Sequence, residues 1–143
     1  MTVKAILSRK GGDVVTIEPT ATLSTAVKLL ADRRIGAVVV TDLDRRVAGI
    51  LSERDVVRAI AARGPAALEA AVETVMTRKV VTSSHSETMA VVMERMTAGK
   101  FRHLPVIEQD RLVGIISIGD VVKFRLEEIE SESNALREYI LTA

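Results

Sequence analysis

The chain repeats itself, and an internal repeat restricts the possible folds more than any single motif does. When the sequence is shifted by 66 positions, VVTIEPTATL from Val14 falls on VVTSSHSETM from Val80, and four residues are identical. The lead-in segments, VKAILSRK from Val3 and VETVMTRK from Val72, match at an offset of 69. The duplication therefore covers nearly everything up to residue 126.

Each repeat has the pattern of a strand, a helix, two strands and a second helix. Apolar residues at i, i+3, i+4 and i+7 predict the first helix of each repeat, although methionines at such spacing also simply fill a core. They are Leu23, Ala26, Val27 and Leu30 in the first repeat and Met89, Val92, Met93 and Met96 in the second. The β-branched runs IGAVVVTD and FRHLPVIE predict strands that enter hairpins, VAGILS and LVGIIS predict the returning strands, and VVRAIAARG and VVKFRLEEI predict the closing helices.

The repeat also predicts how the chain is organised. A half of about 65 residues buries too little surface to be stable alone, whereas two packed halves share a larger core. We therefore expect an α+β fold, a pseudo-twofold pair of β-α-β-β-α repeats packed sheet to sheet, followed by a C-terminal helix. The expected divisions are 1–71 for the first repeat with its lead-in and linker, 72–126 for the second repeat and 127–143 for the helical extension. The cleft between the halves is where a site is expected.

Composition excludes several classes of function. The chain has 20 basic and 19 acidic residues, two Phe, one Tyr and no Trp, which argues against a nucleic-acid partner. It has no Cys and two His, which argues against disulfides, thiolate chemistry and an all-histidine zinc site, so no metal is expected. The N-terminus lacks the apolar stretch of a signal peptide or membrane span, so the expected location is cytoplasmic with no membrane partner.

The motif Gly-x-x-Ser-x-x-Asp occurs twice, as GILSERD at 49–55 and GIISIGD at 114–120. Its spacing fits a capping box, in which a serine caps a helix and the aspartate three residues later returns the hydrogen bond. The same geometry fits a nucleotide site, because a helix N-terminus attracts anions and a carboxylate accepts two hydrogen bonds from the cis-diol of ribose. Both interpretations remain open at this point.

The two repeats differ where the motif copies are expected to meet. Arg102 and His103 stand where the first repeat has Gly36 and Ala37. Each also fits an ordinary surface role, Arg102 as a solvated charge and His103 as a hydrogen-bonded edge residue. A proline cannot donate to a sheet ladder, so Pro105 beside them indicates an edge or a bulge. Two unequal sites are therefore expected.

The sequence resembles a tandem pair of cystathionine-β-synthase (CBS) domains, the arrangement called a Bateman module, over about residues 1 to 126. The motifs that carry the resemblance are GILSERD, GIISIGD, RHLPV, IGAVVV and VMT. The resemblance implies a stand-alone sensor, not an enzyme, that uses no catalytic cofactor. It implies a regulatory ligand that contains adenosine, such as AMP, ADP, ATP, NAD(H) or S-adenosylmethionine, and an output through self-association or an unidentified regulated protein. The alternative is a ligand-free dimerisation or partner-docking module with the same fold.

The resemblance also implies which residues touch the ligand. Asp55 and Asp120 would hold ribose with support from Ser52 and Ser117, and no residue is implied to be catalytic. The further residues implied to line the sites or to meet phosphate are Thr16, Ile17, Gly36, Ala37, Arg54, Thr82, Arg102, His103, Leu104, Pro105 and Gly119. Arg54 is a phosphate candidate that the matching Gly119 cannot copy, so unequal occupancy is expected.

The C-terminal segment carries a heptad pattern, with core positions separated by alternating steps of four and three residues. These positions are Val122, Leu126, Ile129, Ser133, Leu136 and Ile140. The pattern spans fewer than three heptads, so it predicts a long helix that either packs on its own domain or helps form a homodimer.

Overall fold

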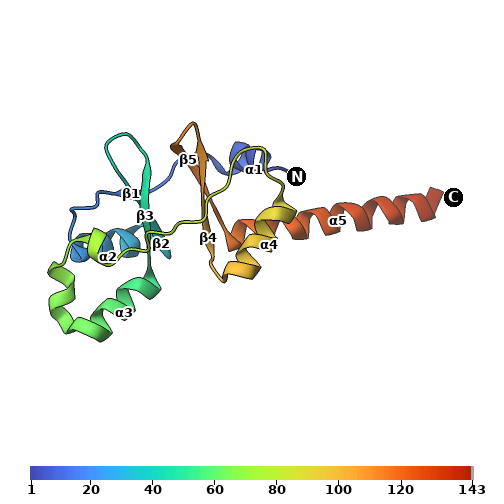
Figure 1. Ribbon diagram of the computed structural model, residues 1–143. Coiled ribbons are helices and arrows are strands. Elements are labelled where there is room, and N and C mark those ends of the chain that lie inside the picture. Colours follow the sequence, from blue (N-terminus) through green and yellow to red (C-terminus); the bar gives the residue numbers. More distant parts are fainter. Residues whose placement is uncertain (143) are drawn as a thin grey trace.

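Two β-hairpins stand next to each other at the centre of the computed structural model, which describes residues 1–142 (Figure 1). In the first half, the sheet order is β1-β2-β3, with β1 parallel and β3 antiparallel to β2. In the second half, β4 and β5 pair antiparallel. The strands are β1 (Thr16–Ile17), β2 (Ala37–Thr41), β3 (Val47–Ser52), β4 (His103–Glu108) and β5 (Arg111–Ser117). The β-branched runs of the sequence thus form the hairpins that they predict.

The first strand of the second repeat is reduced to a single bridge. Ser83 pairs parallel with Val106, just as Ile17 pairs parallel with Val40 in the first repeat. Both partners are displaced by 66 positions, so the structure reproduces the register of the sequence repeat. A serine at the buried position packs less apolar surface than an isoleucine, which accounts for the shorter pairing.

The helices follow the same repeat. They are α1 (Val3–Lys10), α2 (Leu23–Arg33), α3 (Glu53–Arg63), α4 (Met89–Gly99) and α5 (Ile118–Thr142), with short 3-10 turns η1 (Gly64–Glu69) and η2 (Val72–Thr74). Thr22 caps α2 and Thr88 caps α4, each by accepting a hydrogen bond from the backbone N–H three residues on. One uninterrupted helix, α5, contains both the closing helix of the second repeat and the C-terminal extension. Among residues 1–142, no helix is long and apolar enough to cross a bilayer.

The lead-in segments cross over between the halves. Val3, Ile6 and Leu7 of α1 belong to the core of the second half, whereas Val72 and Met76 belong to the core of the first half. In Figure 1 the N-terminal helix accordingly lies beside β5 and not beside β1. Each lead-in thus packs against the repeat that it does not precede.

Each crossing is made close by the glycine that opens the repeated motif. A Cβ on Gly49 would lie 2.5 Å from Met76 Sδ, and a Cβ on Gly114 would lie 2.6 Å from Leu7 Cδ1. Such distances are shorter than any van der Waals contact, so a side chain at either position would force the lead-in to move. The glycine that opens each motif copy therefore allows a lead-in to pack closely against the strand.

The hairpins contact each other at their tips. The N–H of Leu112 donates to the carbonyl of Arg45 at 3.0 Å, and Arg46 Nε lies 3.1 Å from Asp110 Oδ2. The helices lie on the outer sides of the pair, with α2 and α3 on one side and α1, α4 and α5 on the other (Figure 1). The expected α+β duplication with its sheets facing each other and a C-terminal helix is confirmed.

Candidate functional site

A cavity of about 530 Å³ lies between the two halves, at the end of β3 and the start of α3. The residues that line it come from the start of β2 and the residue before it, from β3, from α3, from residues 77–81, and from the end of α4 through the start of β4. They are Gly36, Ala37, Ile50, Ser52, Glu53, Arg54, Asp55, Arg58, Thr77, Lys79, Val80, Val81, Gly99, Lys100, Phe101, Arg102 and His103. Seven predicted site residues meet here: Gly36, Ala37, Ser52, Arg54, Asp55, Arg102 and His103.

Several lining residues were not predicted from the sequence, although some had a signal. Thr77 and Lys79 belong to the second lead-in, whose match to the first lead-in at an offset of 69 marks them as equivalent to Ser8 and Lys10. Arg58 follows Arg54 by one helical turn, and such residues lie on one face of a helix. Lys100 and Phe101 enter from the opposite half and carry no such signal.

Asp55 makes the capping box that its spacing predicts. Asp55 Oδ2 accepts hydrogen bonds from the Ser52 N–H at 3.0 Å and the Ser52 hydroxyl at 3.1 Å, while the Asp55 N–H donates to that hydroxyl at 3.2 Å. The other carboxylate oxygen, Oδ1, is approached by the Thr77 hydroxyl at 3.4 Å, which is a long hydrogen bond. Because a carboxylate can accept about four hydrogen bonds, the cap leaves acceptor capacity facing the cavity.

Asp120 makes the same cap, but an ammonium group also holds it. Its Oδ2 accepts from the Ser117 N–H at 2.8 Å and the Ser117 hydroxyl at 3.0 Å. Lys10, the last residue of α1, places its Nζ 2.5 Å from the same oxygen and donates to the Ile115 carbonyl at 2.8 Å. Burial raises the pKa of Asp120, but the hydrogen bonds from Lys10 and Ser117 outweigh it, so the pKa is lowered.

The two motif copies therefore differ in what their carboxylates face. The lysine equivalent to Lys10 is Lys79, which lines the open cavity. Within residues 1–142, Lys79 makes no ion pair, whereas Lys10 forms one with Asp120. The two motif copies thus differ in the lysines of their lead-ins, a difference that the sequence comparison of Arg102 with Gly36 did not reveal.

The cavity at Asp55 is electropositive. Five cationic side chains line it, against the two carboxylates of Glu53 and Asp55. The cations are Arg54, Arg58, Lys79, Lys100 and Arg102. A concave surface with such an excess attracts anions, and the N-terminus of α3 adds its own partial positive charge. Apolar side chains from Ile50, Val80 and Val81 complete the walls.

His103 lies where the two halves meet, beside Gly36. A Cβ on Gly36 would lie 3.5 Å from the His103 Cε1, so the glycine leaves room for the imidazole. Burial lowers the pKa of His103, Lys10 and Arg102 lower it further, and Glu53 and Asp120 oppose them. The lowered pKa favours the neutral imidazole, whose ring can both donate and accept a hydrogen bond.

Five predicted site residues are not among those that line the cavity, and four of them lie in strands of the two sheets. Thr16 pairs with Val39, Ile17 belongs to the core of the first half, and Leu104 is completely buried in the core of the second. The carbonyl of Thr82 accepts from Arg95 at 3.0 Å, and the carbonyl of Pro105 accepts from the Ser83 N–H at 2.9 Å. Pro105 is followed by a shift in the β4/β5 register between Val106 and Ile107.

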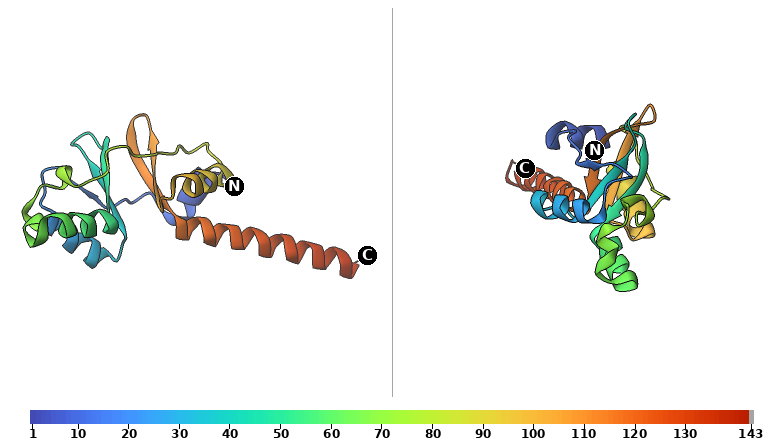
Figure 2. Two further views of the ribbon diagram at one scale, coloured as in Figure 1. Left: turned by 60° about the horizontal axis from the view of Figure 1, so that its bottom comes forward. Right: turned by 90° about the vertical axis from the view of Figure 1, so that its left-hand side faces the viewer.

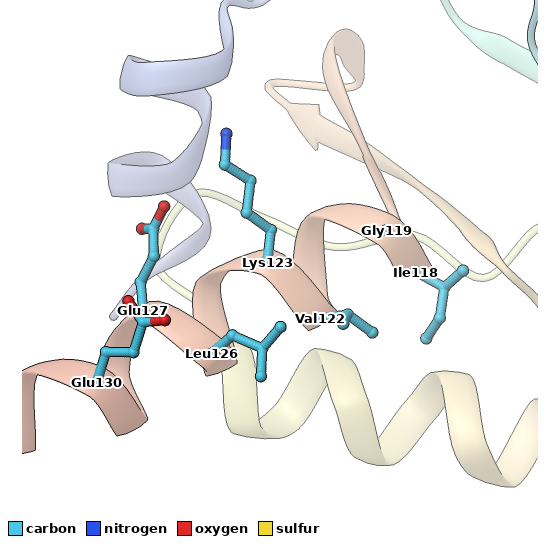
Figure 3. A pocket seen from close by; sticks show the side chains of 7 residues that line it. All are labelled: Ile118, Gly119, Val122, Lys123, Leu126, Glu127 and Glu130. Carbon is cyan, nitrogen blue, oxygen red and sulfur yellow. The ribbon is translucent and has the colours of Figure 1, made fainter. Parts of the chain in front are cut away.

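The remaining predicted residues, Ser117, Gly119 and Asp120, lie at the start of α5 and are not among the residues that line the cavity at Asp55. Gly119 borders a shallow groove of about 530 Å³ along α5. Ile118, Val122 and Leu126 point to one side of this groove, whereas Lys123 and Glu127 point toward α1 (Figure 3). Among the described residues, no cluster of His, Asp or Glu has the arrangement of a metal site.

Comparisons with known proteins agree with this architecture. The CBS domain family model matches residues 3–62 and 72–127. A CBS-domain containing protein from Agrobacterium tumefaciens is 52% identical, with a TM-score of 0.84 over 87% of this chain and 99% of that chain. A CBS domain protein from Pyrobaculum aerophilum, solved in complex with AMP, is 28% identical, with a TM-score of 0.73 over 84% of this chain and 89% of that one.

A curated relative leads to the same family. The mitochondrial CBS domain-containing protein of Arabidopsis thaliana is 34% identical over 123 residues, which is 83% of this chain. The matched region spans only 60% of the length of that plant protein. Since the family model covers both repeats and the crossed, duplicated architecture agrees with the solved structures, the chain belongs to the CBS domain family and carries two copies of the domain.

Proposed function

We propose that the protein is a non-enzymatic regulatory module that binds one phosphate-bearing adenosine ligand in the cavity at Asp55. The observation that carries this proposal is the asymmetry of the two motif copies. Asp55 faces an open, electropositive cavity, whereas Lys10 occupies the carboxylate of Asp120. The AMP bound by the Pyrobaculum aerophilum protein supports the same class of ligand.

The roles follow from the chemistry of the lining. Asp55 Oδ1 accepts hydrogen bonds from the ribose diol while Oδ2 keeps the helix cap. The adenine ring lies against the apolar walls formed by Ile50, Val80 and Val81. Arg54 and Arg102 contact the phosphates, which the other cations of the cavity attract.

Charge decides among the adenosine ligands. A cavity of about 530 Å³ is within the usual range for a site that holds a small molecule. The excess of cations favours AMP, ADP, ATP or NAD(H), all of which carry phosphate, over S-adenosylmethionine, whose sulfonium is positive. The output of binding is a change in self-association or in the contact with a regulated protein.

A second candidate function is a ligand-free dimerisation or docking module. The capping boxes favour it, because each serine and aspartate of the motif has a complete structural role at its helix start. This alternative gives no reason for the cations that surround Asp55, so we place it second.

Calorimetric titration of the wild type, Asp55→Asn and Asp120→Asn with AMP, ADP, ATP, NAD, NADH and S-adenosylmethionine tests the proposal. We expect one phosphate-bearing ligand per chain for the wild type and for Asp120→Asn, and no measurable binding for Asp55→Asn. The amide keeps one acceptor for the cap, so the fold of this variant is retained. At a hundredfold excess over the dissociation constant, the ligand should add about 2.7 kcal/mol to the free energy of unfolding. Absence of binding for every ligand would select the ligand-free module.

A further inference from the structure

The distal part of α5 leaves the body of the protein. Every residue from Ile129 to Thr142 is exposed, and the helix extends away from both halves (Figure 2). Leu136 is 60% exposed and Ile140 is 64% exposed, although both are apolar. The packing of this segment on its own domain, which the sequence left open, is therefore not what the structure shows. The exposed segment from Ile129 to Thr142 is short enough to be marginal as a helix in water, so contact with a partner would stabilise it.

The exposed apolar residues lie on one seam of the helix. In heptad notation, Ile129 and Leu136 take position d, and Ser133 and Ile140 take position a. The seam continues toward the body through Leu126, which is 56% exposed. A seam of this period fits a second helix with the same period, and another copy of α5 supplies one.

The charges beside the seam select one orientation. Glu130 and Arg137 take position e, and Arg125 and Glu132 take position g. In a parallel, in-register pair, each g residue faces the e residue five positions further along the other helix. Glu132 then faces Arg137 of the second copy, and Arg125, which also contacts Glu128 in its own helix at 3.2 Å, faces Glu130 of the second copy. Both kinds of pair are attractive, and twofold symmetry forms each of them twice.

Antiparallel pairing centred on the distal part, residues 129–142, is less favourable for the same charges, because it sets e against e and g against g. In the register that pairs Ile129 with Ser133, Glu130 faces Glu130 and Glu132 faces Glu132. In the register that pairs Ser133 with Leu136, Glu130 meets Arg137 but Glu132 has only a tyrosine opposite. Among these arrangements, the parallel one is the arrangement in which Glu130, Glu132 and Arg137 each face an opposite charge.

We propose that the distal part of α5 pairs in parallel and in register with α5 of a second copy of this chain. This inference deepens the self-association part of the proposed function and does not depend on a bound nucleotide. The seam has few layers and a serine at its central a position, so the pairing should be reversible and dependent on chain concentration.

A cysteine scan tests the orientation, because the chain contains no cysteine of its own. In the Ser133→Cys variant, parallel pairing places the two thiols opposite each other, so a short bis-maleimide should convert most chains to a covalent dimer on a denaturing gel. The matched control is Ser131→Cys, at position f on the outer side of the helix, which should stay monomeric. Equal cross-linking of both variants, or none of Ser133→Cys, would overturn the proposal.

Charge reversal tests the pairing by an independent measurement, sedimentation equilibrium without nucleotide. Glu132→Lys and Arg137→Glu should each weaken dimerisation on the order of tenfold, since each turns two attractive contacts into repulsive ones. The double variant that combines Glu132→Lys with Arg137→Glu should restore the dimer, because it swaps the two charges and both contacts become attractive again. A double variant as weak as the single ones would overturn the parallel register. Nucleotide titration of the wild type separates a failure of this inference from a failure of the proposed function.

Discussion

Replacing Lys10 with methionine probes the contact that distinguishes the two motif copies. Methionine keeps most of the alkyl chain that packs at the end of α1 but removes the ammonium group. The variant loses the ion pair with Asp120, in which the Lys10 side chain is 30% exposed and the Asp120 side chain is 19% exposed. It also loses the hydrogen bond to the Ile115 carbonyl at 2.8 Å. No other contact of the motif needs to change.

The expected cost follows from these two contacts. A partly exposed ion pair is worth up to about 1 kcal/mol, and a hydrogen bond from a charged donor adds about 1 kcal/mol more. For a chain of this length, a total of about 2 kcal/mol lowers the melting temperature by about 5 °C. Because Lys10 helps to lower the pKa of Asp120 in the folded state, its stabilisation is complete above the unfolded carboxyl pKa of about 3.9 and is lost as the pH falls through the folded value.

Thermal unfolding followed by circular dichroism from pH 7 to pH 3 measures both effects. The difference between wild type and Lys10→Met should be largest near pH 7 and should shrink below about pH 4. Lys79→Met is the matched control, since Lys79 is the equivalent lysine of the other lead-in and should matter for nucleotide affinity but not for the melting temperature. Equal melting temperatures of Lys10→Met and wild type at pH 7 would refute the assigned contact, as would a difference that persists unchanged at pH 3.

The close packing of the lead-ins and the titration of His103 give further predictions. Gly49→Ala and Gly114→Ala should each destabilise the fold by about 1 to 3 kcal/mol in chemical denaturation. In a double-mutant cycle, Leu7→Ala should remove the penalty at Gly114, whereas Met76→Ala should leave one at Gly49, where a backbone carbonyl also lies 2.8 Å from the added Cβ. Burial lowers the pKa of His103, so the unfolded chain protonates this imidazole at a higher pH than the folded chain does. The free energy of unfolding should therefore fall as the pH drops below about 6.5. His103→Gln should flatten that slope in melting curves from pH 7.5 to pH 5, and an unchanged slope would contradict the assignment.

Much of the fold could be predicted because the chain contains an internal repeat, so that each half can be compared with the other. The offset of 66 predicts that Ser83 occupies the place of Ile17, and the structure pairs both with equivalent valines. The helix starts could also be predicted, since Ser52 and Asp55 satisfy each other within three residues of sequence. Local hydrogen bonding and periodicity were sufficient for these features.

The rest depended on contacts between distant parts of the chain. Lys10 reaches Asp120 across 110 positions of sequence, and nothing in either segment alone indicates that contact. The sequence likewise could not predict that Thr16 and Leu104 would be used in pairing and core packing, because motif matching does not reveal which face of a strand is buried. Lys100 and Phe101 join the cavity only because the second half folds against the first.

The crossing of the lead-ins bears on how such a chain could have arisen. A single repeat with its own lead-in cannot close its core in the manner seen here, because α1 lies over the second half while Val72 and Met76 complete the first. Two separate copies of one repeat could close both cores by exchanging these segments. Gene duplication would then convert an exchanged dimer into one chain without altering any contact, and afterwards one copy could keep its lysine near an open cavity while the other turned its lysine onto an aspartate.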